Sequence, residues 1–322
     1  MIYYVQSNTS LIDALRQADI PGAIKTMGDP IRVTMGICAY NEVANIERAI
    51  RSASEQALDG FELEEIIVVS SESTDGTDDV VKNLMSEISS VRLIRQEKRE
   101  GKNSAVNRFL DEKKTKIVVI MNADTIFIDK NCLQHLLAPL IDDEAGIVGG
   151  HPIPTNDTKT IAGFASHMIW NMHHHVSLIS PQIGEIIAFR DIGTRLSINN
   201  SGDEGTLKME IEKAGYKSIY APEAKVWNKG PETTSDFLKQ RTRVNIGERI
   251  MKKEQDYDLP TWSFKNLYSA YIETIKDLGF HPIKILAATS MEFYSRLKAL
   301  IHVRSNKGDI GAWEPIKTTK KI

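Results

Sequence analysis

A short polar segment follows a strongly apolar run near the middle of the chain. Residues 116–120 read Lys-Ile-Val-Val-Ile, and Met121-Asn122-Ala123-Asp124 comes directly after them. Oxygen ligands at the carboxyl end of a buried strand suit a hard divalent cation, and such a cation neutralises the charge of a bound diphosphate. An aspartate at a strand end is equally common where a turn or a helix cap begins. The surrounding residues decide between these two interpretations.

The elements that position this segment alternate along the first half of the chain. Apolar runs of strand length are separated by stretches with helical periodicity, which predicts an α/β fold with a mostly parallel central sheet and helices on both faces. The predicted strands are 32–40, 64–70, 91–96 and 116–121, and the predicted helices are 42–56, 78–88 and 103–113.

Polar side chains gather where each predicted strand ends. Because ligands bind beyond the carboxyl ends of parallel strands, four successive ends offer hydrogen-bonding groups to one cleft. Neither G-x-G-x-x-G after the first strand nor G-x-x-x-x-G-K-[ST] occurs, so a metal and side chains must handle any phosphate. The polar groups are Asn41 and Glu42, Ser70 to Glu72, Glu100 to Lys102, and Asn122 with Asp124.

The composition is that of an ordinary globular protein. The 322 residues are 41% hydrophobic and 26% charged, with a formal net charge of −3, which gives no reason to expect nucleic acid as a partner. The two cysteines, Cys38 and Cys132, have no metal-site or disulfide-framework spacing. No apolar run is long enough to span a bilayer, and the first residues lack the pattern of a signal peptide. We therefore expect a cytoplasmic location, with contact to the cytoplasmic face of a membrane left open.

Several motifs, in this order and spacing, resemble one known family. They extend over roughly residues 31–250 and are similar to those of the inverting, family-two nucleotide-sugar glycosyltransferases with a GT-A fold. The segments that carry the resemblance are Ile37 to Glu42 with Asn45 and Ile46, Val68 to Thr77, Gly101 to Asn107, the Asn-Ala-Asp segment in place of D-x-D, Gly215 to Lys217, Tyr220 to Ala224, Gly230 to Thr233, and Gln240 to Arg243.

The resemblance implies a donor site for a UDP- or GDP-linked sugar with Mg²⁺ or Mn²⁺. Asp124 matches the second aspartate of D-x-D, whereas Asn122 replaces the first and offers a neutral oxygen to the metal. Ser71 stands near the aspartate that often binds the base, so no preference for uracil carries over. The donor residues implied are Ala39, Tyr40, Glu42, Ser71, Lys102, Asn122 and Asp124.

The resemblance also places the catalytic base in one segment. Counted back from Gly215, the family's Glu-Asp pair falls on Asp203-Glu204 in reversed order, and the second position, Glu204, takes the base role. Inverting transfer needs one carboxylate to remove a proton from the acceptor hydroxyl. Asp203 remains the reserve candidate, and it is also a natural N-cap for a helix over 204–214.

Contacts to the acceptor or the diphosphate are implied for Gln240, Arg241 and Arg243, on a helix predicted over 234–253, and for Arg190. Arginine offers bidentate donors to a leaving phosphate. The tryptophan of the family's Q-x-x-R-W is Val244 here, which puts a stacked sugar platform in doubt. A basic, solvated helix face is the alternative interpretation.

The chain divides on this reading into an N-terminal extension (1–30), a GT-A domain (31–254, split at 125 into a donor half and an acceptor half) and a mainly helical extension (255–322). The mixture of apolar and basic residues over 283–303 predicts a helix that rests on a membrane, packs on the catalytic domain or forms a homodimer. The acceptor is expected to be a glycan or lipid-linked.

Two other functions stay open. A nucleotidyltransferase needs a glycine-rich loop that residues 31–45 lack, and a catalytically idle nucleotide-sugar-binding or scaffold protein is conceivable because of Asn122 and the reversed Asp203-Glu204 pair.

Overall fold

The first half of the chain forms the parallel part of the central sheet, as the alternation predicts. The computed structural model describes residues 29–198, 203–255 and 263–305 together with 316 and 319, so most of the predicted N-terminal extension lies outside the described residues. The first four strands are β1 (Ile31–Ala39), β2 (Phe61–Ser71), β3 (Val91–Gln96) and β4 (Ile117–Asn122), and each pairs in parallel with its neighbours in the order β3-β2-β1-β4.

The three helices between these strands begin close to their predicted positions, with one exception. Residues 42–45 form a turn instead of helix, since the amides of Asn45 and Ile46 both donate to the carbonyl oxygen of Glu42, at 2.9 Å each. This turn leaves the Asn41-Glu42 segment outside the helix, at the strand end. The helices are α2 (Ile46–Ser54), α3 (Thr77–Glu87) and α4 (Lys102–Glu112).

The second half completes an eight-stranded mixed sheet of order β3-β2-β1-β4-β7-β6-β8-β5. Strand β7 lies between β4 and β6 and is antiparallel to both, whereas β6 and β8 are parallel. The elements are β5 (Thr125–Phe127), α5 (Cys132–Leu137), a 3-10 turn (Ala138–Ile141), β6 (Ala145–Pro154), α6 (Ile161–Ile179), β7 (Ile186–Arg190), α7 (Asp203–Lys213) and β8 (Lys217–Asn228).

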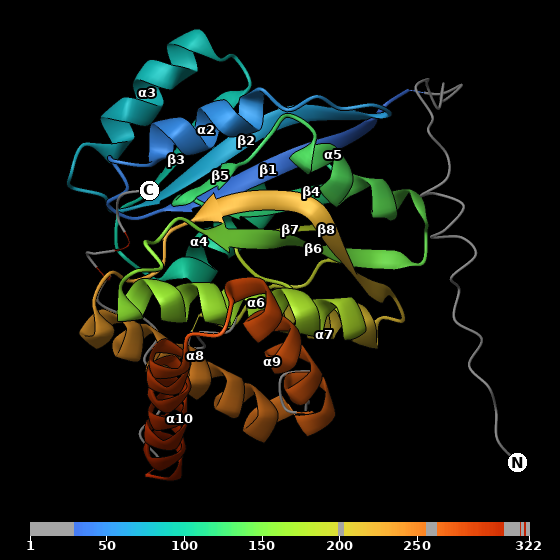
Figure 1. Cartoon of the computed structure of the whole chain (residues 1–322). Helices are drawn as coiled ribbons and strands as arrows, with labels where there is room; N and C mark the ends of the chain where they lie inside the picture. The colour runs from blue at the N-terminus through green and yellow to red at the C-terminus, as the bar shows by residue number, and fades with distance from the viewer. Residues whose placement is uncertain (1–28, 199–202, 256–262, 306–315, 317–318, 320–322) are drawn as a thin grey trace, which may run out of the picture.

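Helices lie on both faces of the sheet (Figure 1), and an apolar core fills the space between helices and sheet on each face. Helices α2, α3 and α5 pack on one face through residues such as Ile50, Leu84 and Leu136. Helices α4 and α7 pack on the other, where Gly36 of β1 meets Phe109 of α4 so closely that a Cβ at position 36 would lie 2.6 Å from the ring. The close approach of α4 therefore depends on that glycine.

A layer of long helices lies below the sheet in Figure 1 and contains the predicted C-terminal helices. An apolar cluster joins Phe164 of α6, Phe237 of α8 and Ile285 of α10, so the C-terminal helix packs on α6 and α8 through one face. No helix within the described residues is both long and apolar enough to cross a bilayer. The helices are α8 (Thr234–Gln255), α9 (Phe264–Leu278) and α10 (Pro282–Arg304).

An ion-pair network fixes α10 to α8. The guanidinium of Arg241 donates to both carboxylate oxygens of Glu292, at 2.8 and 3.0 Å, and Arg296 donates to the same carboxylate at 2.8 Å. Burial opposes ionisation of Glu292, but the two arginines overcome it and hold its pKa at about 2. The carboxylate is 17% exposed, so the pair is mostly withdrawn from water.

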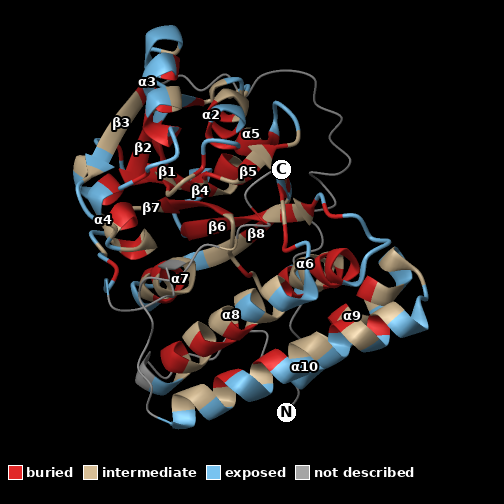
Figure 2. Ribbon diagram, turned by 90° about the vertical axis from the view of Figure 1, so that its left-hand side faces the viewer, coloured by how far each residue is buried: buried red, intermediate tan, exposed pale blue. Residues whose placement is uncertain are grey.

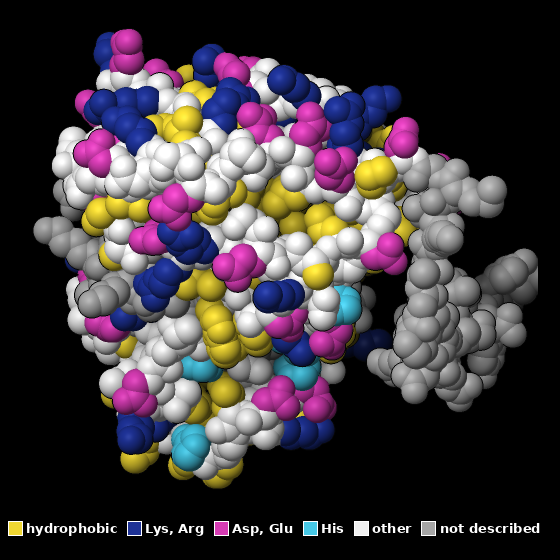
Figure 3. Space-filling model, turned by 90° about the horizontal axis from the view of Figure 1, so that it is seen from above, with side chains coloured by type: hydrophobic (Ala, Val, Ile, Leu, Met, Phe, Trp, Pro, Cys, Tyr) yellow, Lys and Arg dark blue, Asp and Glu magenta, His cyan; other side chains and the backbone are white. Residues whose placement is uncertain are grey.

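The surface seen from above in Figure 3 carries basic and acidic side chains intermingled over the described residues. This pattern agrees with the near-neutral formal charge of −3. It presents no broad field of one sign on that face.

Replacing Glu292 by Gln leaves two arginines without their carboxylate, so the free energy of unfolding at pH 7 should fall by about 3 kcal/mol. The pKa of this carboxyl is about 2 in the folded chain against 4.5 for an ordinary glutamate, so its stabilisation is complete above about pH 4.5 and is lost as the pH falls toward 2. Urea denaturation at pH 7, 4 and 3 should show the gap to wild type narrowing with acidity.

The matched control is Glu273→Gln, which removes an exposed carboxylate paired with Lys276 on α9. Exposed pairs contribute little, so this change should stay within about 0.5 kcal/mol at every pH. A gap for Glu292→Gln no larger than that of the control would show that the network does not stabilise the fold.

Candidate functional site

One pocket of about 640 Å³ lies at the carboxyl ends of β1, β2 and β4, between the sheet and the helical layer. It collects side chains that are far apart in the sequence, including two residues, Ile316 and Thr319, near the end of the chain. The predicted site residues that line it are Ala39, Tyr40, Glu42, Ser71, Lys102, Asn122, Asp124, Glu204, Gln240, Arg241 and Arg243.

The loop after β1 is held by the loop after β2. The amide of Glu42 donates to Thr77 Oγ1 at 2.8 Å, and the amide of Asn41, whose φ is +54°, donates to Ser73 Oγ at 3.1 Å. Asp75 accepts hydrogen bonds from the amides of Val43 and Thr77, and these bonds, with the Thr77 hydroxyl, outweigh burial and lower its pKa. The motif residues of the two loops thus build one rigid wall.

The part of the pocket around Tyr40 contains a residue that the motifs do not indicate. The guanidinium of Arg99 lies over the ring of Tyr40, 4.2 Å from its centroid, and both residues line the pocket. Ser71, in place of the base-binding aspartate, donates to Gln96 Oε1 at 2.7 Å, and Gln96 in turn donates to Ser104 at 2.9 Å. Arg99 directly precedes the Glu100 to Lys102 group predicted after β3, so a strand-end group that began one residue earlier would have included it.

Lys102 and Glu204 meet across the pocket. Lys102 Nζ lies 2.6 Å from Glu204 Oε1, and the side chains are 36% and 20% exposed. Helix α4 also anchors the backbone that leads toward α7, since Asn103 and Asn107 donate to the carbonyl oxygens of Ser197 and Leu196 at 2.7 Å each. The Gly101 to Asn107 motif therefore positions both the lysine and the start of the segment that carries Glu204.

Asp203 begins α7, as the helix prediction allows, but its side chain and residues 199–202 lie outside the described residues. Glu204 is the member of the pair that lines the pocket.

The Asn122-Ala123-Asp124 segment stands beside a carboxylate that the motifs did not indicate. The side-chain amide of Asn122 donates to Glu185 Oε2 at 2.6 Å, and its backbone amide donates to the Glu185 carbonyl oxygen at 3.1 Å. Burial raises the pKa of Glu185, and so does the nearby charge of Asp124. Within the described residues, no group of three or more His, Cys, Asp or Glu side chains is arranged to hold a metal. The available set is two carboxylates and the amide oxygen of Asn122, which are ligands of the type that Mg²⁺ and Mn²⁺ accept.

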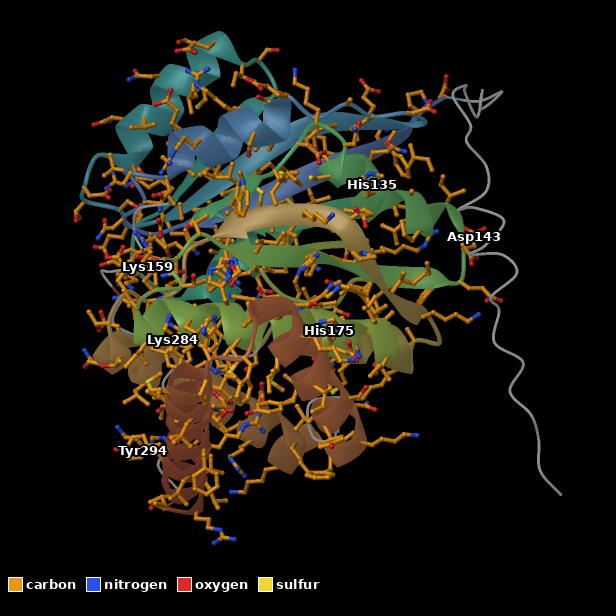
Figure 4. All side chains as sticks on the ribbon, viewed as in Figure 1. His135, Asp143, Lys159, His175, Lys284 and Tyr294 are labelled. Atoms are coloured by element: carbon orange, nitrogen blue, oxygen red, sulfur yellow. The ribbon has the colours of Figure 1, made fainter. Side chains whose placement is uncertain are left out.

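Helix α6 supplies the opposite wall. Trp170 and His173 line the pocket with ring centroids 5.2 Å apart, and burial lowers the pKa of His173 to about 4. The neighbouring histidines point elsewhere, as expected for successive helical positions: His174 lies 2.8 Å from the Tyr220 hydroxyl, and His175 pairs with Asp277 of α9. Figure 4 shows His175 at this junction of α6 and α9.

The arginines predicted for the acceptor or diphosphate separate into two groups. Arg243 and Arg241 line the pocket with Gln240, and Arg241 is the residue held by Glu292 of α10. Arg190 does not reach the pocket. Its guanidinium donates to the carbonyl oxygens of Ala145 and Leu140 and lies 3.4 Å from Asp143, at the far end of the sheet (Figure 4).

The position of Arg190 has a topological reason. Strand β7 is antiparallel to β4, and Arg190 pairs with Ile117 at the start of that strand. The end of β7 is therefore at the edge opposite the pocket, and the expected contact of Arg190 with acceptor or diphosphate has no support here.

Comparisons with known proteins agree with this geometry. The sequence is similar to the probable glycosyltransferase YdaM of Bacillus subtilis (strain 168), 25% identical over 255 residues that cover 73% of this chain and 59% of that protein. It is also similar to poly-beta-1,6-N-acetyl-D-glucosamine synthase of Staphylococcus aureus (strain COL), 23% identical over 256 residues that cover 76% of this chain and 61% of that protein. The chain thus spans about three fifths of the length of the curated relatives it matches.

Among solved structures, the fold is similar to that of the mannosyltransferase PcManGT from Pyrobaculum calidifontis in complex with GDP-Man and Mn²⁺. The TM-score is 0.56 at 21% identity, and the match covers 93% of this chain and 86% of the other. The similarity shows a shared fold, which confirms the predicted GT-A architecture with helices after the sheet. A family model described as glycosyl transferase family 2 matches residues 34–200, more than half of the 322 residues. The chain therefore belongs to glycosyl transferase family 2.

Proposed function

We propose that this protein transfers a sugar from a nucleoside-diphosphate sugar to an acceptor hydroxyl with inversion at the anomeric carbon. The observation that carries the proposal is the convergence of Tyr40, Lys102, Asp124, Glu204 and Arg243 on one pocket, although they come from separate elements. The family membership supports the reaction class. The proposed donor is UDP- or GDP-linked, and Ser71 leaves the base open.

The donor would lie along the sheet edge. The nucleoside would border the Tyr40 and Arg99 pair, Glu42 and Ser71, where a planar ring and a guanidinium already stack. The diphosphate would reach Asp124 and Asn122 through Mg²⁺ or Mn²⁺, which supplies charge neutralisation of the leaving group when bound. Arg243 and Arg241 would add donors from α8 to the same leaving group.

Glu204 is the proposed base, and its ion pair with Lys102 suggests how donor binding would prepare it to accept a proton. The carboxylate must come within about 2.6–3.2 Å of the acceptor hydroxyl to take its proton. In the structure Oε1 is held by Lys102 at 2.6 Å. A diphosphate offers Lys102 a partner of higher charge, so donor binding would draw the ammonium away and leave Glu204 facing the acceptor. The ordering of donor before acceptor follows from this exchange.

Asp124→Asn should lower the affinity for UDP or GDP in the presence of Mn²⁺ by at least about tenfold, because it removes a full carboxylate from the proposed metal ligands. Titration calorimetry with each nucleotide measures the change. Asp143→Asn is the matched control, since that carboxylate is 100% exposed at the opposite end of the sheet. Equal nucleotide affinity in Asp124→Asn and wild type would remove Asp124 from the donor site.

Glu204→Gln should keep nucleotide affinity within a few-fold and reduce transfer by about a hundredfold or more, the usual effect of losing a positioned general base. The control is Glu210→Gln on the same helix, where the carboxylate pairs with Lys213 away from the pocket. Should Glu204→Gln stay active while Asp203→Asn is inactive, the base moves to Asp203. Full activity in both would contradict a base in this segment, whereas nucleotide binding without transfer by wild type would favour the catalytically idle protein.

The acceptor is proposed to be a glycan or lipid-linked molecule reached at a membrane surface. Helix α10 packs through Ile285 and Ala288 on one face and exposes Ile283, Leu286, Phe293 and other apolar residues on the other. Figure 2 shows this exposed face of α10, and Figure 4 shows Tyr294 projecting from it into solvent. Exposed Lys298 and Arg304 lie on the same helix. Apolar and basic side chains together are typical of a helix that lies in the headgroup region of anionic lipid.

Co-sedimentation with vesicles tests this surface. Binding to anionic vesicles should exceed binding to neutral ones, at about 1 kcal/mol per basic residue near the surface, and should weaken with salt. Phe293→Glu should reduce binding, whereas Ile141→Glu, at a site 54% exposed at the far end of the sheet, should not. A protein that stays in the supernatant, with size-exclusion showing a dimer that Phe293→Glu dissociates, would assign the face to a homodimer instead.

A further inference from the structure

Glu185 occupies an unusual position at the entrance to β7. It lines the pocket and follows Gly184, and its φ is +34°, in the left-handed region that residues with a side chain seldom adopt. The strand it precedes is antiparallel, so its start lies beside the end of β4, where Met121 pairs with Ile186. The topology thus brings residue 185 next to the Asn122 to Asp124 segment, although 63 positions separate it from Asn122.

The contacts of Glu185 orient the neighbouring amide. Because Asn122 Nδ2 donates to Glu185 Oε2 at 2.6 Å, the remaining polar atom of that side chain is its oxygen, which is the atom a cation can use. Asp124, two residues after Asn122, lines the same pocket as Glu185. Two carboxylates and one amide oxygen therefore face the same pocket.

Two buried oxygens beside this group lack partners among the described residues. Asn228 is 4% exposed, lines the pocket and donates to Glu185 through its amide, yet its Oδ1 accepts no hydrogen bond. Thr125, fully buried, follows Asp124 and pairs with Asn228 between β5 and β8, and its Oγ1 is also without a partner. Unsatisfied buried oxygens next to two carboxylates are what a bound cation and its water ligands would satisfy.

We propose that Glu185 supplies a second carboxylate to a divalent-cation site shared with Asp124 and the amide oxygen of Asn122. The inference rests on the proposed function, in which a Mg²⁺- or Mn²⁺-bound diphosphate occupies this end of the pocket. It explains how a chain with the neutral Asn122 in its D-x-D position retains two negative charges for the cation. The second charge comes from a different strand instead of from the motif.

A different role for Glu185 would give a different outcome. A purely structural carboxyl, held by Asn122 and Asn228, would be replaced by the isosteric glutamine without consequence for metal binding. A metal ligand would not be, because an amide carries no charge and the site would keep only Asp124. Removing the like charge beside Asp124 should also leave the metal-free protein at least as stable as wild type.

The experiment is a titration of the full chain with Mn²⁺. Electron paramagnetic resonance measures binding as the loss of the free-Mn²⁺ signal. The titration is done with Mn²⁺ alone and with UDP or GDP added. Glu185→Gln should weaken Mn²⁺ binding by at least about tenfold. Adding Asn122→Asp to Glu185→Gln returns a carboxylate to the site and should restore binding to within about threefold of wild type. Glu144→Gln, 66% exposed at the far end of the sheet, should bind as wild type.

Thermal unfolding of each variant without metal identifies a folding defect. Recovery of Mn²⁺ binding in Asn122→Asp/Glu185→Gln then distinguishes the loss of a metal ligand from the loss of folding. Unchanged Mn²⁺ binding in Glu185→Gln, or no recovery in Asn122→Asp/Glu185→Gln, overturns the inference while nucleotide binding by wild type still supports the proposed function. Failure of wild type to bind UDP or GDP with Mn²⁺ contradicts the proposed function itself, and the inference with it.

Discussion

Charges that are partly withdrawn from water must be compensated, and the pocket is arranged around that requirement. Asp124, Glu185 and Glu204 are among the carboxylates that line the cavity at the sheet edge. Lys102 lies 2.6 Å from Glu204, whereas burial, together with the nearby charge of Asp124, raises the pKa of Glu185. Lys102 compensates the charge of Glu204, and the proposed cation would compensate the charges of Asp124 and Glu185. A diphosphate with a bound divalent cation would pair with Lys102 and would bring the cation to Asp124 and Glu185.

The same requirement connects the helical layer to the site. Arg241 lines the pocket from α8, and its charge is held by Glu292 of α10, which lines the pocket as well. The C-terminal helix is therefore part of the wall that faces the proposed diphosphate, while its other face stays exposed. A helix that positions an arginine on one side and presents apolar residues on the other would couple the proposed membrane contact to the active pocket.

Much of this arrangement was predictable because parallel strands end at one edge. The predicted strands and helices of the first half are present, and the strand-end rule predicts that Glu42, Ser71, Lys102 and Asp124 meet at one cleft, as they do. The turn at 42–45 was not predictable from periodicity, since the apolar spacing of the following helix continues through it. The first half of the chain was predictable because its elements follow from the local sequence pattern. Their arrangement follows from the rule that parallel strands end at one edge of the sheet.

The residues that were missed enter by routes that local pattern does not encode. Glu185 reaches the site because β7 inserts antiparallel beside β4, and the same inversion carries Arg190 to the far edge. Glu292 reaches it because α10 packs back on α8, which no motif indicates. In each case the decisive fact is the direction or docking of an element in the second half of the chain, where strand order departs from sequence order.

The most direct test of the account is the anomalous diffraction of a crystal grown with Mn²⁺ and UDP or GDP. The account predicts one Mn²⁺ peak between Asp124 and Glu185, with the diphosphate bound to it and Lys102 turned from Glu204 to a phosphate oxygen. A nucleotide bound without metal, or a Mn²⁺ peak that Asp124 does not ligate, would contradict it.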